Sequence, residues 1–205
     1  MTFFIFASFP IFCFLFSFAL HNTRRKDEDI DREFWDREQR ANFTRKKPLD
    51  DLEYITIPED LLTMKPAVMT EELQNCLQDL NDLSSSKIVN LTGYTNTDLK
   101  LKYGTANITI LSDYDFHYTK LVTLLQKLAE LLHDSLEDGL AVKVLEFAVS
   151  TGTDVSKSYY LLAELYQQMN TPEKIEHLIT QAQNINSLMK DTIVENLQAA
   201  CRSAC

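Results

Sequence analysis

The segments VTLLQKLAELLH (residues 122–133) and SKSYYLLAELYQ (residues 156–167) share the tetrapeptide Leu-Ala-Glu-Leu at the same place, 34 residues apart. At this offset three more positions hold small or apolar residues in both copies: Leu132 and Tyr166, Leu145 and Ile179, and Ala148 and Ala182. Leucines recur every three or four residues, which is the period of a helix with one buried face. The sequence therefore predicts an internal repeat of helical hairpins, in which small alanines let neighbouring helices approach closely.

The sequence on both sides predicts further helices joined by short turns. We expect helices over residues 70–83, 116–133, 140–149, 155–169 and 191–200, and another that begins after Thr171 with Pro172 at its first position. Thr70 is the expected cap of the first of these helices, and a turn is expected at Asp138-Gly139. With 4 Gly and 5 Pro in 205 residues, the chain lacks the glycine loops and dense turns of other classes, which favours an all-α fold.

Residues 56–115 are expected to mix helix and loop. The segment from Tyr54 to Pro58 is typical of extended chain. Between Lys87 and Asp113, Leu99, Leu101 and Tyr103 alternate with polar residues as in a strand. We favour instead a short helix capped by Asn96 and ended by Gly104.

The 34-residue period and the Leu-Ala-Glu-Leu pair resemble the tetratricopeptide repeat, whose unit is a helix-turn-helix of that length. The resemblance covers Val122 to Met189, and residues 191–200 resemble its capping helix. Tyr159 stands where that family usually has an aromatic residue, whereas Leu125 stands there in the first copy, and the proline between repeats is absent. An irregular helical bundle is the alternative. The resemblance implies a helical-repeat domain over residues 116–205 with a binding groove on its inner face.

Four residues are the candidate binding residues of that groove: Glu130, Tyr159, Glu164 and Tyr166. Glu130 and Glu164 occupy equivalent positions of the repeat and would line an acidic concave surface. The alternative is that both carboxylates lie on a solvated helix face.

Residues 1–20 are expected to form an N-terminal transmembrane helix. Nineteen residues from Thr2 to Leu20 carry no charge, and a helix of this length rises about 28 Å, close to the thickness of a bilayer core. Arg24, Arg25 and Lys26 follow, which favours a single-pass anchor of the cell membrane with the soluble domain in the cytoplasm. The alternative is a cleaved signal peptide and an exported domain, for which Asn42, Asn90 and Asn107 would be glycan acceptors in N-x-[ST] tripeptides.

Residues 21–55 predict a charged juxtamembrane helix or linker. Ile30, Phe34 and Ala41 share one helical face with Trp35 beside it, and a solvated stalk is favoured over contact with lipid. Together with the apolar N-terminus, the segments REFW (residues 32–35) and DLEYITIP (residues 51–58) resemble a group of bacterial anchored proteins to which no activity is attached.

The net charge of −10 disfavours a nucleic-acid partner. The sequence contains no nucleotide-binding loop, no G-x-S-x-G and no H-E-x-x-H motif, and its histidines are not in ligand spacing, so we expect no catalytic residue, no metal and no cofactor. Cys201 and Cys205 make only a weak metal pair. We therefore expect a membrane-tethered, non-catalytic adaptor that binds a protein or peptide partner. The alternatives are an exported helical protein or an enzyme with unfamiliar carboxylate or thiol chemistry.

Overall fold

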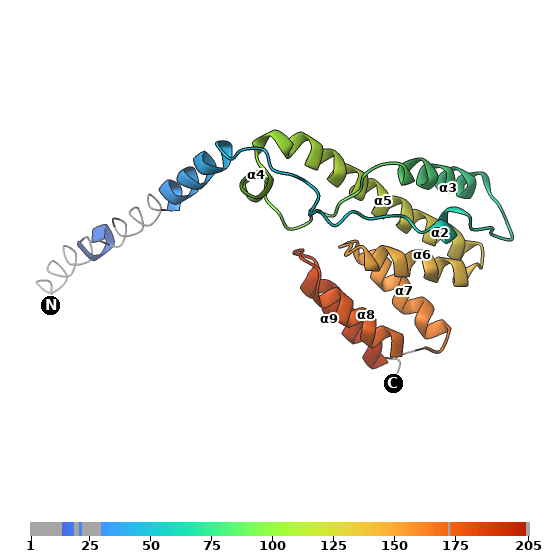
Figure 1. The fold of residues 1–205 in the computed structure, drawn as a ribbon. Helices are drawn as coiled ribbons and strands as arrows, with labels where there is room; N and C mark the ends of the chain where they lie inside the picture. The colour runs from blue at the N-terminus through green and yellow to red at the C-terminus, as the bar shows by residue number, and fades with distance from the viewer. Residues whose placement is uncertain (1–13, 19–20, 22–29, 172, 204–205) are drawn as a thin grey trace, which may run out of the picture. The chain divides into compact units, whose positions relative to one another are not determined.

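The computed structural model describes residues 14–18, 21, 30–171 and 173–203, and these residues are helical without a strand (Figure 1). An isolated antiparallel bridge joins Tyr54 and Val89. The expected all-α class is therefore confirmed for the described part of the chain. Of the predicted transmembrane segment, residues 1–13 and 19–20 lie outside the description. Among the residues that are described, no helix combines the length and the apolar character that crossing a membrane requires.

The chain forms two compact units, which we call unit 1 (Met1–Pro48 with Thr95–Ile108) and unit 2 (Leu49–Tyr94 with Thr109–Cys205). In unit 1, residues 30–42 form a helix, followed in the second segment by α4 (Asn96–Tyr103) and the 3-10 turn η1 (Thr105–Asn107). Thr95 caps α4 through its side chain, and Gly104 ends the helix at φ 91°. The predicted short helix is confirmed, but its cap is Thr95 and not Asn96.

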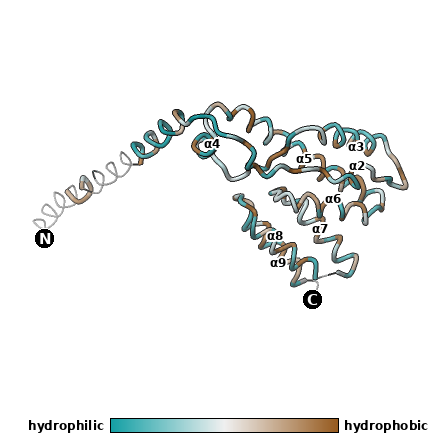
Figure 2. Tube along the Cα trace, in the orientation of Figure 1, coloured by the Kyte–Doolittle hydropathy of each residue, from teal (hydrophilic) through white to brown (hydrophobic). Residues whose placement is uncertain are grey.

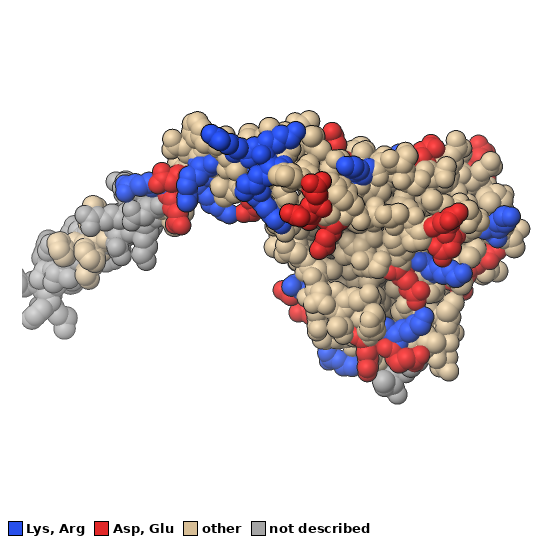
Figure 3. All heavy atoms as spheres, in the orientation of Figure 1, with Lys and Arg blue, Asp and Glu red and all other residues tan. Residues whose placement is uncertain are grey.

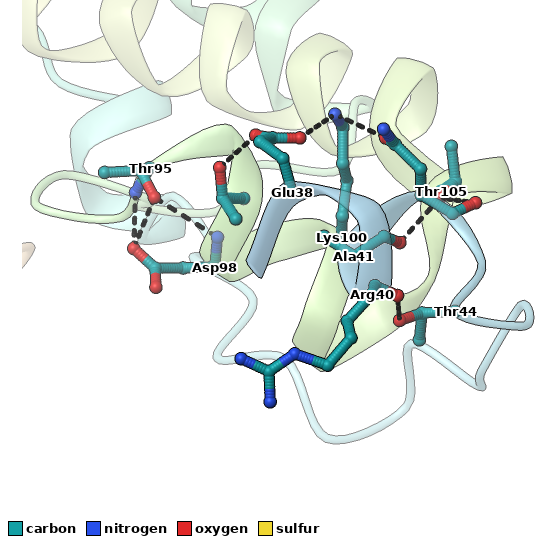
Figure 4. A network of polar contacts seen from close by, with 10 residues as sticks. Glu38, Arg40, Ala41, Thr44, Thr95, Asp98, Lys100 and Thr105 are labelled. Atoms are coloured by element: carbon teal, nitrogen blue, oxygen red, sulfur yellow. Dashed lines mark hydrogen bonds and ion pairs between the residues drawn. The ribbon is translucent and has the colours of Figure 1, made fainter. Parts of the chain in front are cut away.

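Polar side chains fasten the helix of residues 30–42 to α4 (Figure 4). Glu38 accepts a hydrogen bond from Thr97 Oγ1, and Lys100 Nζ lies 3.0 Å from its other carboxylate oxygen. These two donors lower the pKa of Glu38, with the Thr97 hydroxyl as the larger cause. Ala41 is fully buried beside this network, and the hydroxyl of Thr105 donates to its carbonyl at 3.0 Å. The C-terminal half of the helix is thus fixed within unit 1.

Unit 2 is built from helices that share one hydrophobic core. These helices are α2 (Glu59–Leu62), α3 (Glu71–Ser84), α5 (Ile108–Asp134), α6 (Asp138–Ser150), α7 (Ser156–Gln168), α8 (Glu173–Gln183) and α9 (Lys190–Ser203). α7 contacts α6, α8 and α9, and α8 also contacts α6 and α9. Hydrophobic and hydrophilic residues are interspersed along these helices (Figure 2), and the buried residues of α3, α5, α7 and α8 recur at helical spacing.

The two hairpins of unit 2, α5–α6 and α7–α8, have the same backbone design 34 residues apart. Each first helix ends in a left-handed residue, Leu136 at φ 63° and Asn170 at φ 55°. The next amide then bonds back to the helix, from Glu137 N to Leu132 O at 2.8 Å and from Thr171 N to Tyr166 O at 2.9 Å. The residues that match at this offset and are buried in both hairpins include Leu128 and Leu162, Ala129 and Ala163, and Ala148 and Ala182. The internal periodicity of the sequence is therefore also a periodicity of the structure.

Two boundaries differ from the sequence-based expectation, and one agrees with it. The long helix α5 begins at Ile108, eight positions before the expected Phe116, because its extra turns gain the burial of Leu111. The turn expected at Asp138-Gly139 is wrong, since both residues belong to α6 and the turn is made by residues 135–137. Thr70 caps α3 as expected, accepting from Leu73 N at 3.2 Å.

Candidate functional site

A groove lies between the C-terminal half of α5 and the facing side of α7. It has a volume of about 240 Å³. Its lining residues are Gln126, Glu130, His133, Asp134, Lys157, Tyr160, Leu161 and Glu164. On each helix the residues follow the three- and four-residue spacing of a single face. The groove is therefore a direct product of the repeat, because equivalent faces of two successive first helices are brought side by side.

A buried hydrogen bond fixes the floor of this groove. Ser158 Oγ, on α7, donates to Gln126 Oε1, on α5, at 2.6 Å, and both residues are buried. The amide nitrogen of Gln126 then donates to Glu130 Oε1 at 2.9 Å. Because this amide has a partner at each end, its orientation is defined, and so is the position of the Glu130 carboxylate above it.

The charge of the groove is mainly negative. Glu130, Asp134 and Glu164 contribute carboxylates, and Lys157 Nζ stands 3.9 Å from Glu130 Oε1, a distance that leaves the pair loose. His133 is held by Asp138, whose Oδ1 lies 2.6 Å from His133 Nδ1. That hydrogen bond is the main reason why the pKa of His133 is raised above its ordinary value. Three carboxylates on one small surface attract a cationic group.

The aromatic wall of the groove is Tyr160, and α9 positions it. Asn196 Nδ2 donates to the Tyr160 hydroxyl at 2.8 Å. Beside it, Leu161 adds an apolar surface that is partly buried against the core. The groove thus combines carboxylates with an aromatic ring and an aliphatic side chain. Such a combination suits the long stem and charged head of a lysine or arginine.

Of the four residues expected to bind a partner, the structure brings together Glu130 and Glu164 in this groove. Tyr159 and Tyr166 are not in it. Tyr159 is fully buried, and its hydroxyl donates to Thr153 O at 2.8 Å. Tyr166 is 5% exposed, and its hydroxyl donates to Glu146 Oε1 at 2.8 Å. Burial raises the pKa of both hydroxyls, which therefore stay protonated as donors in the core.

Sequence reasoning missed several residues of the groove, above all His133, Lys157 and Tyr160. A helical-spacing signal was present, because these positions lie three, four or seven residues from Glu130 or Glu164. The two buried tyrosines follow from the same spacing: Tyr159 and Tyr166 lie seven residues apart on the face of α7 that contains Leu162. In a helix with several aromatic residues, helical spacing alone does not show which aromatic face is buried and which lines a groove.

A second hollow of unit 2, of about 420 Å³, adjoins the C-terminal ends of α6 and α8. Asn90 lines it, and the amide nitrogen of Asn90 donates to the Tyr118 hydroxyl, to Thr151 O and to Gly152 O at 3.0–3.1 Å. In unit 1, Asn107 Nδ2 likewise donates to two backbone carbonyls at 2.8 Å. In the folded protein these two amides serve structure and are not free to carry a glycan, whereas Asn42 is exposed.

Within the described ranges, no group of three His, Cys, Asp or Glu side chains is arranged to hold a metal ion. Cys76 is buried, which raises the pKa of its thiol, while Cys201 is partly exposed at the end of α9. Cys13 and Cys205 lie outside the described residues. Comparison of the chain with models of protein families, with curated proteins and with solved structures finds no match.

Proposed function

We propose that the protein is a membrane-tethered, non-catalytic adaptor whose tetratricopeptide-like hairpins bind a basic segment of a protein partner. One observation carries this proposal: Glu130 and Glu164, 34 residues apart in the repeat, line the same groove between α5 and α7. Residues 2–20 are the proposed tether to the cell membrane, and the hairpins are proposed to lie on its cytoplasmic side.

The repeat geometry supports this choice of fold family. The equivalent left-handed residues Leu136 and Asn170, and the equivalent hydrogen bonds that follow them, give the two hairpins the same turn. In stacked hairpin arrays the first helices line one continuous surface, on which an extended peptide or a helix binds. The groove between α5 and α7 lies between two such first helices.

The size of the groove supports a peptide side chain as the bound group. A volume of about 240 Å³ is below the roughly 300–1,000 Å³ that is usual for small-molecule pockets. It is large enough for one lysine or arginine side chain, whose charged head would meet Glu130 and Glu164 while its stem rests on Tyr160 and Leu161. A peptide with several basic residues would extend along the surface on either side.

The binding experiment uses the full chain and two synthetic peptides, one with alternating lysine and alanine and the other with glutamate in place of lysine. We expect the lysine peptide to bind with a dissociation constant that rises with salt, and the glutamate peptide not to bind. The double substitution E130Q/E164Q removes two partly exposed charges, so we expect about tenfold weaker binding, corresponding to about 0.7 kcal/mol for each pair.

The matched control is E173Q/E176Q, which removes two exposed carboxylates from the first turn of α8, away from the groove. Equal weakening by both double substitutions would show that only the overall charge is recognised and would contradict the groove. Circular dichroism checks that each variant is folded.

The tether is tested separately by topology. A reporter placed after Cys205 should be protected from protease in intact cells, on a membrane-bound chain of full length. If the reporter is accessible, or the chain is shorter by about 20 residues, the length of a signal peptide, the tethered and inward orientation is wrong.

A further inference from the structure

The helix of residues 30–42 and the turn that follows carry large apolar side chains on the surface of unit 1. Phe34, Trp35 and Phe43 are 53%, 67% and 79% exposed. Together with Glu38, Gln39 and Asn42 they surround a hollow of about 630 Å³. The hydrogen bonds and ion pairs that join this helix to α4 and η1 are made by Arg37, Glu38, Ala41 and Asn42, and not by the three rings. Exposed apolar patches of this kind mark interaction surfaces.

Unit 1 also differs from unit 2 in charge. Its sequence contains 11 Lys and Arg against 8 Asp and Glu, whereas unit 2 contains 9 against 22. Figure 3 shows the basic side chains crowded together over unit 1. Arg40 and Phe43 line one hollow of about 550 Å³, and Arg45, Lys46 and Lys47 follow immediately in the sequence. Exposed rings and exposed cations thus occur together within residues 34–47.

We propose that this surface, made by Phe34, Trp35, Arg40, Phe43 and the basic run Arg45 to Lys47, docks on an anionic lipid membrane. Tryptophan favours the headgroup level of a bilayer, where its ring is in an apolar environment and its N–H stays hydrated. Phenylalanine rings beside it add apolar surface that can be buried at the same boundary. Lysine and arginine near an anionic leaflet gain from its negative surface potential. Rings and cations placed side by side match that interface in both respects.

The length of the chain favours a membrane over an acidic protein as the occupant. This step rests on the tether in the proposed function. If Leu20 lies in a bilayer, the chain between it and Phe34 is only 14 residues long and spans at most about 50 Å even when fully extended. The surface is then held within reach of lipid headgroups at a high effective concentration, at which weak contacts suffice.

Trp35 is the sole tryptophan of the chain, so its fluorescence reports directly on this surface. The experiment incorporates the full chain into vesicles of phosphatidylcholine, with or without phosphatidylglycerol, in which the acyl chains are brominated near the headgroup. In the anionic vesicles we expect a blue-shifted emission, quenching by the bromolipid and protection from aqueous iodide. In the zwitterionic vesicles, and in the anionic vesicles at high salt, we expect these effects to be lost.

Two variants test the residues themselves. R40Q/R45Q/K46Q should lose the dependence on anionic lipid, and F34S/F43S should lose the bromolipid quenching. The controls alter unit 2 in the same way: K120Q/K127Q/K143Q removes three exposed cations, and L136S/L188S removes two leucines that are 87% and 100% exposed. Both controls should behave as the unchanged chain does.

The outcomes separate the docking surface from the tether. If the chain floats with both kinds of vesicle while iodide quenches Trp35 equally in both, the docking surface is wrong and the tether stands. Quenching by bromolipid in both kinds of vesicle would also overturn the recognition of anionic lipid. Flotation with anionic vesicles alone, lost in R40Q/R45Q/K46Q, would support the surface and contradict the tether. A chain that floats with neither contradicts both.

Discussion

Asn90 connects three parts of unit 2 through one side chain. Its amide nitrogen donates to the Tyr118 hydroxyl of α5 and to the carbonyls of Thr151 and Gly152 after α6, while its Oδ1 accepts from Thr92 N at 2.9 Å. Burial raises the pKa of Tyr118 to about 12, so its hydroxyl remains protonated at neutral pH. Sequence alone marked Asn90 only as part of an N-x-[ST] tripeptide.

We expect Asn90→Ala to lower the free energy of unfolding by about 2–3 kcal/mol, since each lost hydrogen bond contributes about 1 kcal/mol. Denaturant unfolding followed by circular dichroism measures it. Asn184→Ala is the control, because Asn184 is exposed and its amide donates to Thr180 O of α8, the helix that it directly follows. Equal losses in the two variants would mean that the Asn90 network does not stabilise the fold.

His133 and Asp138 form a pair that makes stability depend on pH. The hydrogen bond to Asp138 raises the pKa of folded His133 above 6.5, and the charges of Asp138, Glu164 and Asp134 act in the same direction, against desolvation. Lys157, which lines the same groove, carries a positive charge, opposite to that of these carboxylates. A raised folded-state pKa gives a stabilisation that is complete below the unfolded-state pKa and is lost as the pH rises through the folded-state value.

The midpoint of thermal unfolding should therefore exceed that of His133→Gln by more at pH 5.5 than at pH 9. An NMR titration of the His133 ring should give a pKa above the ordinary histidine value of 6.5. If the difference between the two proteins stays constant across this range, the pair contributes no pH-dependent stability.

At the scale of elements, the equivalent turn position of the two hairpins holds two different residues. Leu136 and Asn170 both adopt the left-handed conformation, which asparagine tolerates better than leucine. Leu136 is 87% exposed, so burial of its side chain contributes little free energy to offset the strain of the left-handed backbone. We expect Leu136→Asn to raise the free energy of unfolding by about 0.5–1 kcal/mol. Leu188→Asn, at another exposed leucine, should leave it unchanged in the same denaturant titration.

The cap of α4 gives a prediction that distinguishes Thr95, the cap seen in the structure, from Asn96, the cap expected from sequence. Thr95 accepts from Asp98 N, and Asp98 returns a hydrogen bond by accepting from Thr95 N at 3.0 Å. These bonds to Thr95 are also the main reason why the pKa of Asp98 is lowered. Thr95→Ala should destabilise unit 1 by about 1 kcal/mol, whereas Asn96→Ala should have little effect. Hydrogen exchange of the α4 amides measures this directly, and the reverse order of effects would place the cap at Asn96.

Sequence predicts an element well when local residue spacing determines it, and poorly when tertiary packing does. Helical spacing gave the positions of α3, α7 and α9 to within a few residues, because their apolar faces are written in the local pattern. The start of α5 was hidden, since Ile108, Thr109 and Ile110 are β-branched and only the burial of Leu111 pays for their helical conformation. The turn at Leu136 was hidden because leucine is not a turn residue. In the groove, the 34-residue repeat predicted Glu130 and Glu164, but the rotation that buries Tyr159 and Tyr166 comes from packing.

At the scale of the whole molecule, the charge is distributed unevenly. Unit 2 contains 22 acidic and 9 basic side chains. The excess carboxylates repel one another, which destabilises the folded state. Raising the salt concentration from 0.01 to 0.15 M shortens the screening length from about 30 Å to about 8 Å. We therefore expect the midpoint of thermal unfolding to rise with sodium chloride over this range. A fall would mean that ion pairs such as Lys174–Glu146, at 3.0 Å, outweigh the repulsion.

Unit 1 is made from two stretches of chain, and Arg37 finds its partner Asp98 only 61 residues later. During synthesis at about 5–20 residues per second, the first stretch therefore leaves the ribosome about 3–12 s before α4 can reach it. In that interval residues 30–42 lack the polar contacts with α4 that fix their helix in the folded protein. A nascent chain of this length therefore carries its aromatic residues close in sequence to a cluster of cations before α4 has been made.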